Sequence, residues 1–173
     1  EKVMIEVAQG VSLSVNEDAN GNVLTSYYLS LDANRSGNTE ATPIIRVNGT
    51  KAEVDADGSY DYIPSVLNLN YCKLMNNNRL AYHENSGVIQ MVENMLSLEA
   101  NQVSSVNLNN CQIIKCTSVS SASDLYPTLY VSAYNMTLNN TIFEDKGAQY
   151  DVYLNWSQNL PYTVSLDGYV YST

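Results

Sequence analysis

The stretch Asn107-Leu108-Asn109-Asn110-Cys111-Gln112-Ile113 has two close counterparts elsewhere in the chain. They are Asn68-Leu69-Asn70-Tyr71-Cys72-Lys73-Leu74 and Thr137-Leu138-Asn139-Asn140-Thr141-Ile142-Phe143. The shared pattern is Leu-Asn-polar-small-x-apolar, and the successive leucines lie 39 and 30 residues apart. Such repeats are typical of stacked architectures, because a unit too short to bury its own core shares one with its neighbours.

The composition favours strands and turns. Asn, Ser, Thr and Val are abundant, and 14 Tyr accompany one Trp and one Phe. Further short β-like runs lie between the repeats, at Gly87–Val92 and Thr128–Val131. We therefore expect an all-β protein, with Asn76–Ser86 and Thr117–Tyr126 as loops. We assign Met91–Gln102 to a strand, with one or two helical turns as the alternative.

Between Val66 and Asn155 this pattern resembles the right-handed parallel β-helix proteins of the pectate-lyase-like superfamily. The resemblance implies a solenoid in which equivalent Asn residues stack at a tight turn and satisfy one another's amide groups. The Asn residues in question are Asn70, Asn109 or Asn110, and Asn139 or Asn140. The irregular repeat length departs from a uniform solenoid.

The region before Pro64 has a different pattern of turns. Its apolar runs are separated by dipeptides that favour hairpins, namely Asn20-Gly21, Asn48-Gly49 and Asp57-Gly58. We therefore expect residues 1–64 to form a hairpin-rich N-terminal region, either a cap or a small β-sandwich. Residues 65–173 are expected to form the parallel β-helix coils and the C-terminal strands.

The charge balance excludes some partners. Eight Lys and Arg against 18 Asp and Glu give a net charge of -10, which repels nucleic acid and anionic lipid. No apolar run approaches the roughly 20 residues of a membrane-spanning helix, so no membrane insertion is expected. The chain starts at Glu1, which we interpret as a mature or trimmed product of a secreted or cell-surface protein. Acceptor triplets for N-glycans begin at Asn34, Asn48, Asn135, Asn139 and Asn155.

The three cysteines, Cys72, Cys111 and Cys116, have no metal-ligand spacing and are expected to be buried free thiols. If Cys72 and Cys111 occupy equivalent positions two coils apart, their separation is about 9 to 10 Å, beyond the reach of a disulfide.

The segment Asp55-Ala56-Asp57-Gly58-Ser59-Tyr60-Asp61 is the candidate metal site. Its alternating carboxylates Asp55, Asp57 and Asp61 resemble the start of a calcium loop. The bidentate Glu that would close such a loop is missing, because position 66 is Val. A solvated Asp-Gly hairpin turn is the simpler interpretation.

Tyrosines crowd the C-terminal third of the chain, and aromatic faces suit sugar rings or partner proteins. Tyr150, Tyr153 and Trp156 are the candidate ligand-binding residues, with half-buried strand tyrosines as the alternative.

No catalytic residues are assigned. A glycosidase needs two carboxylates across one bond, and a lyase needs a base beside calcium-binding acids. No spacing ties an acid of the repeat region to a basic residue, and His83 is the only histidine.

These features together favour a secreted or cell-surface non-catalytic module for adhesion, surface architecture or glycan recognition. Its expected partners are an extracellular glycan, a surface protein or a second copy of itself. The alternatives are a polysaccharide lyase or glycoside hydrolase, or an inactive relative of one, and a self-stacking filament subunit.

Overall fold

The computed structural model describes residues 3–25, 28–38, 42–79, 88–93, 98–116, 127–131, 135–144, 150–154, 163–165 and 170–171. The described structure is all-β, as the composition predicts, and contains three five-stranded parallel sheets. Sheet 1 consists of β1 (Ile5–Val7), β4 (Ile45–Asn48), β9 (Ile89–Val92), β12 (Pro127–Val131) and β15 (Tyr150–Leu154). Sheet 2 consists of β2 (Ser12–Val15), β7 (Val66–Asn70), β10 (Ser105–Asn109), β13 (Asn135–Asn139) and β16 (Thr163–Ser165). Sheet 3 consists of β3 (Leu29–Asn38), β8 (Cys72–Arg79), β11 (Gln112–Ile114), β14 (Ile142–Glu144) and β17 (Val170–Tyr171).

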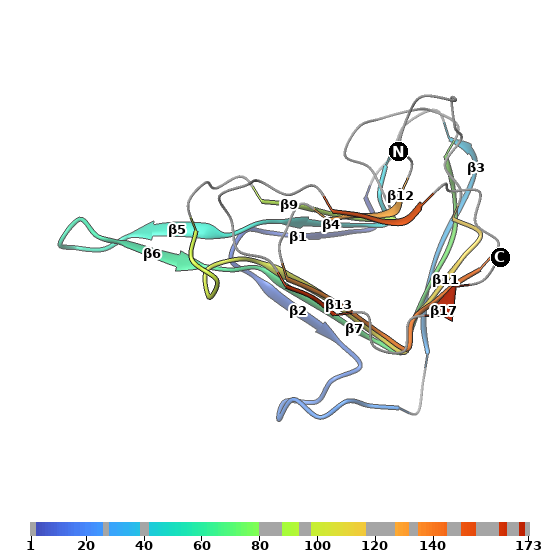
Figure 1. The fold of residues 1–173 in the computed structure, drawn as a ribbon, viewed down its shortest axis with the longest axis horizontal. Coiled ribbons are helices and arrows are strands. Elements are labelled where there is room, and N and C mark those ends of the chain that lie inside the picture. Colours follow the sequence, from blue (N-terminus) through green and yellow to red (C-terminus); the bar gives the residue numbers. More distant parts are fainter. Residues whose placement is uncertain are drawn as a thin grey trace.

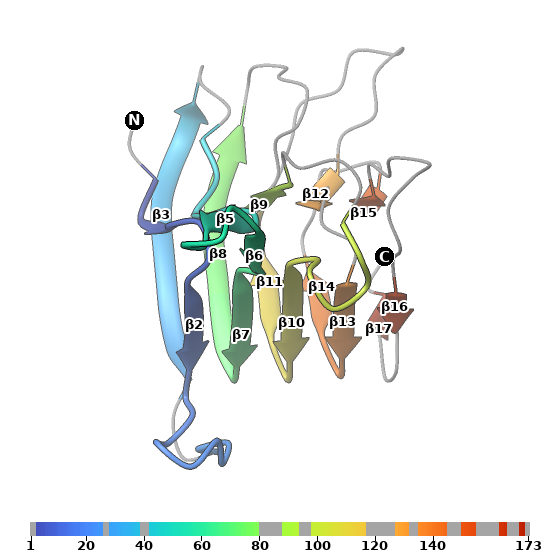
Figure 2. The same cartoon turned by 90° about the vertical axis from the view of Figure 1, so that its left-hand side faces the viewer.

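The chain visits the three sheets in a fixed order, and we call one passage through sheets 1, 2 and 3 a circuit. Strands β1, β2 and β3 enter sheets 1, 2 and 3, and later strands repeat this order until β15, β16 and β17. The sheets lie edge-on around a common interior (Figure 1), and neighbouring strands of sheet 2 lie side by side in chain order (Figure 2). One circuit carries an insertion, the antiparallel hairpin of β5 (Lys51–Val54) and β6 (Tyr60–Ile63), which we call the arm.

The repeated sequence phrase fixes the register of sheet 2. Leu69, Leu108 and Leu138 are direct partners on β7, β10 and β13. Asn109 Nδ2 donates to Asn70 Oδ1 at 3.0 Å, and Asn140 Nδ2 donates to Asn110 Oδ1 at 2.6 Å. The predicted stacking of equivalent asparagines is therefore confirmed.

Residues in the left-handed backbone region turn the chain at two corners. Between sheets 2 and 3 they are Asn16, Tyr71, Asn110 and Asn140, with φ of 55°, 52°, 53° and 46°. Along sheet 3 they are Asn34, Asn76 and Lys115, with φ of 45°, 57° and 53°. Asn tolerates this region better than most other non-glycine residues, which explains why it recurs at these positions.

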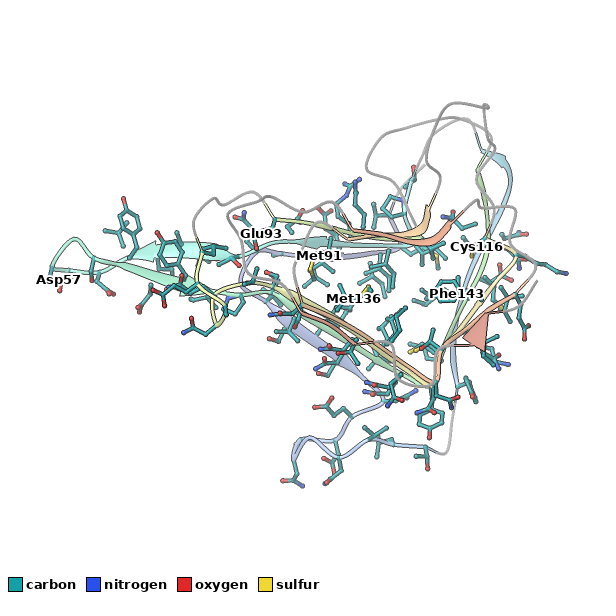
Figure 3. The ribbon with its side chains drawn as sticks, in the orientation of Figure 1. Asp57, Met91, Glu93, Cys116, Met136 and Phe143 are labelled. Atoms are coloured by element: carbon teal, nitrogen blue, oxygen red, sulfur yellow. The ribbon has the colours of Figure 1, made fainter. Side chains whose placement is uncertain are left out.

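Alternate strand residues point into a shared apolar core, as the two-residue period of a strand requires. Leu67, Leu108 and Ile113 are among those at most 1% exposed. Met91, Met136 and Phe143 come from the three different sheets and point into the same interior (Figure 3). Each such side chain contributes about 1.5–3 kcal/mol by leaving water.

The N-terminal strands differ from the expected antiparallel hairpins. Strands β1, β2 and β3 pair in parallel with β4, β7 and β8, so strands on both sides of residue 64 share sheets. Asn48-Gly49 does not close a hairpin, because β4 and β5 belong to different sheets. Antiparallel pairing occurs in the arm and at the Glu17–Val23 bridge around Asn20-Gly21.

The expected separation of Cys72 and Cys111 is wrong. The residues that follow them, Lys73 and Gln112, are register partners on neighbouring strands, about 4.8 Å apart rather than two coils apart. The 39-residue spacing spans one circuit with long connections, not two short circuits. All three thiols are buried and free, as predicted.

The segment Met91–Gln102 is also only partly as predicted. Met91 and Val92 end β9, and Gln102 N–H donates to Glu99 O in a turn. The described part of this segment therefore contains neither the longer strand nor a helical stretch.

Candidate functional site

The arm is the feature of the fold that projects furthest from the three sheets (Figure 1). Its register pairs Ala52 with Tyr62 and Val54 with Tyr60, which places these four residues on one face. Val54 is 64% exposed and Tyr60 58%. The rings of Tyr60 and Tyr62 lie 22° from parallel with centroids 6.3 Å apart. The arm thus presents an uncovered aromatic face.

The candidate calcium ligand Asp57 lies at the tip of the arm (Figure 3), and Asp55 belongs to the same loop between β5 and β6. Asp55 N–H donates to Ser59 O at 2.8 Å and Gly58 N–H donates to Asp55 O at 3.0 Å, with Gly58 at a φ of 85°. This pattern is a three-residue loop with a bulge at glycine rather than a two-residue turn. The Ser59 hydroxyl and N–H both donate to Asp57 Oδ1 and lower the pKa of the Asp57 carboxyl.

The third candidate ligand lies apart from the tip. Asp61 lies on β6, where it is the cross-strand register partner of Glu53 on β5. Within the described ranges, no group of three or more His, Cys, Asp or Glu residues is placed to hold a metal ion. The geometry around Asp55 and Asp57 matches the simpler interpretation, a solvated hairpin turn.

A buried polar network fixes the two ends of the arm where it joins the sheets, and we call it the root network. Thr50 precedes β5, and its N–H donates to Glu93 Oε2 at 2.9 Å while its hydroxyl lies 2.8 Å from the same oxygen. Ser65 follows β6, and its N–H donates to the Ser104 hydroxyl at 2.9 Å. The Ser104 hydroxyl lies 3.2 Å from Glu93 Oε2. Because Thr50, Ser65 and Ser104 are fully buried, this network holds the arm to the sheets.

Sheet 2 presents a neutral polar surface to solvent. Asn107 Nδ2 donates to Asn68 Oδ1 at 2.8 Å, and Asn68 Nδ2 donates to Ser14 Oγ at 3.1 Å. Thr137 continues this row as the register partner of Asn107. The outward residues of β2, β7, β10 and β13, which we call the neutral face, are Ser12, Ser14, Val66, Asn68, Ser105, Asn107, Asn135 and Thr137.

The other two sheets carry charges on their outward positions. On sheet 1, Glu6, Arg46 and Gln90 form one row, in which Arg46 Nε donates to Gln90 Oε1 at 3.0 Å. On sheet 3, Lys73 lies in the outward row of Gln112 and Glu144 in the outward row of Ile114. Among the described outward positions, the neutral face of sheet 2 is therefore chemically distinct.

A shallow hollow of about 650 Å³ lies at the base of the arm. It is lined by Ala8, Gln9, Val11, Asn48 and Lys51. Among the described residues, this lining contains one cation and no carboxylate, and so does not show the paired acids that glycoside hydrolysis needs.

The predicted aromatic ligand site is only partly within what the structure describes. Tyr150 and Tyr153 lie on β15, in register with Pro127 and Tyr130 of β12. Trp156 lies outside the described residues. The site therefore stays a prediction.

No family model, no curated protein and no solved structure matches this chain. Among the described residues, no helix is long and apolar enough to cross a membrane.

Sequence reasoning missed both surfaces. It placed the aromatic site at the C-terminus and interpreted the arm only as a turn with acids, although the alternation Tyr60-Asp61-Tyr62 already separates aromatic from acidic side chains on a strand. The neutral face was also visible as alternate Asn and Thr residues within the repeated phrases.

Proposed function

We propose that the chain is a right-handed parallel β-helix module, secreted or displayed at the cell surface, that recognises glycans without cleaving them. The regular order in which the chain visits the three sheets supports the β-helix assignment. The resemblance of the Asn-containing repeats and their confirmed stacking support it further.

The neutral face carries the functional proposal. Its amides and hydroxyls stand in rows at the strand spacing of about 4.8 Å, and the bonds between them already restrict their rotamers. Such preorganised donors and acceptors match a hydroxyl-rich polymer at a small entropic cost. The net charge of -10 disfavours anionic polymers, so the expected ligand is a neutral polysaccharide.

A glycan-array and polysaccharide-degradation screen, run with calcium and with chelator, tests this proposal. We expect binding of neutral polysaccharide without product in both conditions. Release of unsaturated or reducing ends would instead establish a lyase or hydrolase. Binding that Tyr153→Ala abolishes and Asn107→Ala leaves intact would move the site to the C-terminal tyrosines.

A second candidate function is a self-stacking subunit. It is favoured by the partly buried side chains and the edge strands of the first circuit, which consists of β1, β2 and β3. Leu13 and Leu31 are only partly buried, whereas their register partners Leu67 and Leu74 are at most 1% exposed. Strands β1, β2 and β3 are also the edge strands of their sheets. A second copy stacked on this end would bury those side chains and pair those edges.

Sedimentation velocity at two concentrations tests the second candidate. Stacking predicts larger species at the higher concentration. We expect Val11→Lys to remove these larger species, whereas Val54→Lys on the arm should leave them unchanged. Both residues are exposed, so neither substitution disturbs the core. A single small species at both concentrations would exclude this candidate.

A further inference from the structure

We propose that the arm is a docking site for an extended polypeptide segment in which cationic and apolar side chains alternate. This inference does not depend on the neutral face or on glycan binding.

The two faces of the arm differ in chemistry. Val54, Tyr60 and Tyr62 lie on one face, and they are 64%, 58% and 36% exposed. Glu53 and Asp61 are cross-strand partners on the opposite face. A strand laid beside the arm would direct alternate side chains to these two faces. Apolar residues would therefore meet the tyrosines, and cationic residues would meet the acids.

The arm also has free edges. Strands β5 and β6 form a two-stranded sheet, so in the part of the chain that the structure describes neither has a second ladder partner. Such edges accept an added strand through backbone hydrogen bonds. A two-stranded hairpin alone is only marginally stable in water, so a third strand would stabilise the arm.

Charge selects the partner. The arm and its tip carry Glu53, Asp55, Asp57 and Asp61, all exposed, against the single cation Lys51. Lys51 already forms an ion pair with Glu53. The surplus of carboxylates favours a cationic segment at the arm and repels an acidic one.

The root network prepares the arm for binding. Thr50 and Ser65 anchor both ends of the hairpin through Glu93 and Ser104. A hairpin held in this way loses less conformational entropy on association than a free loop would.

Fluorescence anisotropy with two labelled synthetic peptides tests the proposal. One peptide alternates Lys and Val, and the other has the same composition arranged as a Lys block and a Val block. We expect the full chain to bind the alternating peptide about tenfold more tightly, and the double substitution Tyr60→Ser, Tyr62→Ser to remove that preference. Leu24→Ser, another exposed apolar residue at 48%, serves as the matched control and should change nothing.

Hydrogen exchange locates the binding. Bound peptide should protect backbone amides within Lys51–Val54 and Tyr60–Ile63. Equal affinity for both peptides, or protection confined to the edge strands β1 to β3, would overturn the proposal. A neutral glycan that competes with the peptide and requires Tyr60 would also overturn it and assign the arm to sugar binding.

Discussion

Two glycines in the left-handed region occupy very different surroundings. Gly58 has a φ of 85° and a Cβ there would meet nothing within 4 Å, whereas Gly10 has a φ of 69° and a Cβ there would lie 2.8 Å from Lys51 Cβ. Alanine at Gly58 therefore incurs only backbone strain, about 1 kcal/mol. Alanine at Gly10 adds a clash at the root of the arm, and we expect it to cost at least about 2 kcal/mol.

Urea denaturation of Gly10→Ala and Gly58→Ala measures the two costs. Equal destabilisation would mean that Lys51 moves away without resistance, and that the root of the arm is looser than the structure indicates.

The Cys116 thiol links stability to alkaline pH. Burial raises its pKa from 9.0 to about 11. The folded state therefore holds this proton more tightly, so the stabilisation is complete below pH 9.0 and is lost as pH rises towards 11. The change is on the order of 3 kcal/mol. Denaturation of wild type and Cys116→Ala from pH 8 to 11 measures it, and parallel curves for the two proteins would contradict the assignment.

At this scale the sequence predicted the stacking asparagines, because identical residues recurred at equivalent positions. It did not predict that Tyr71 and Lys115 adopt positive φ. Neither residue favours that region, so the circuit imposes the conformation on them.

Loss of the root network should lower the free energy of unfolding clearly. Glu93 accepts from Thr50 N–H, and both the Thr50 and Ser104 hydroxyls lie within 3.2 Å of its Oε2. Glu93→Gln replaces one acceptor oxygen by a donor amide, so buried donors lose their partner. We expect a loss of about 2–3 kcal/mol in the free energy of unfolding.

Glu99→Gln, at an exposed position nearby, is the matched control for Glu93→Gln. It should change stability by less than about 0.5 kcal/mol. Thermal unfolding compares the two variants. A Glu93→Gln protein as stable as the control would show that the network does not hold the arm.

The sequence predicted which segments form strands better than it predicted which strands pair with each other. Short strands and the hairpin at Asp57-Gly58 follow from local propensity and turn residues. The parallel pairing of β1, β2 and β3 depends on partners 40 or more positions away, as in Ile5 with Ile45 and Ser12 with Val66. Local turn signals therefore favoured antiparallel hairpins that the long-range pairing overrides.

On the scale of the whole molecule, the circuits divide the surface into three faces with different charge. The same circuit contributes Asn107 to the neutral face of sheet 2 and Gln112 to the outward row of sheet 3. Both are amides, so each can be replaced by its acid with almost no change in shape. This pair separates the role of a face from a general effect of added charge.

Calorimetric titration of a neutral polysaccharide identified in the screen, against wild type, Asn107→Asp and Gln112→Glu, tests the central claim most directly. Recognition by the neutral face predicts affinity at least about tenfold weaker for Asn107→Asp, because a buried charge and a lost amide donor both oppose binding, and wild-type affinity for Gln112→Glu. Equal affinity for all three proteins would contradict recognition of the glycan by sheet 2.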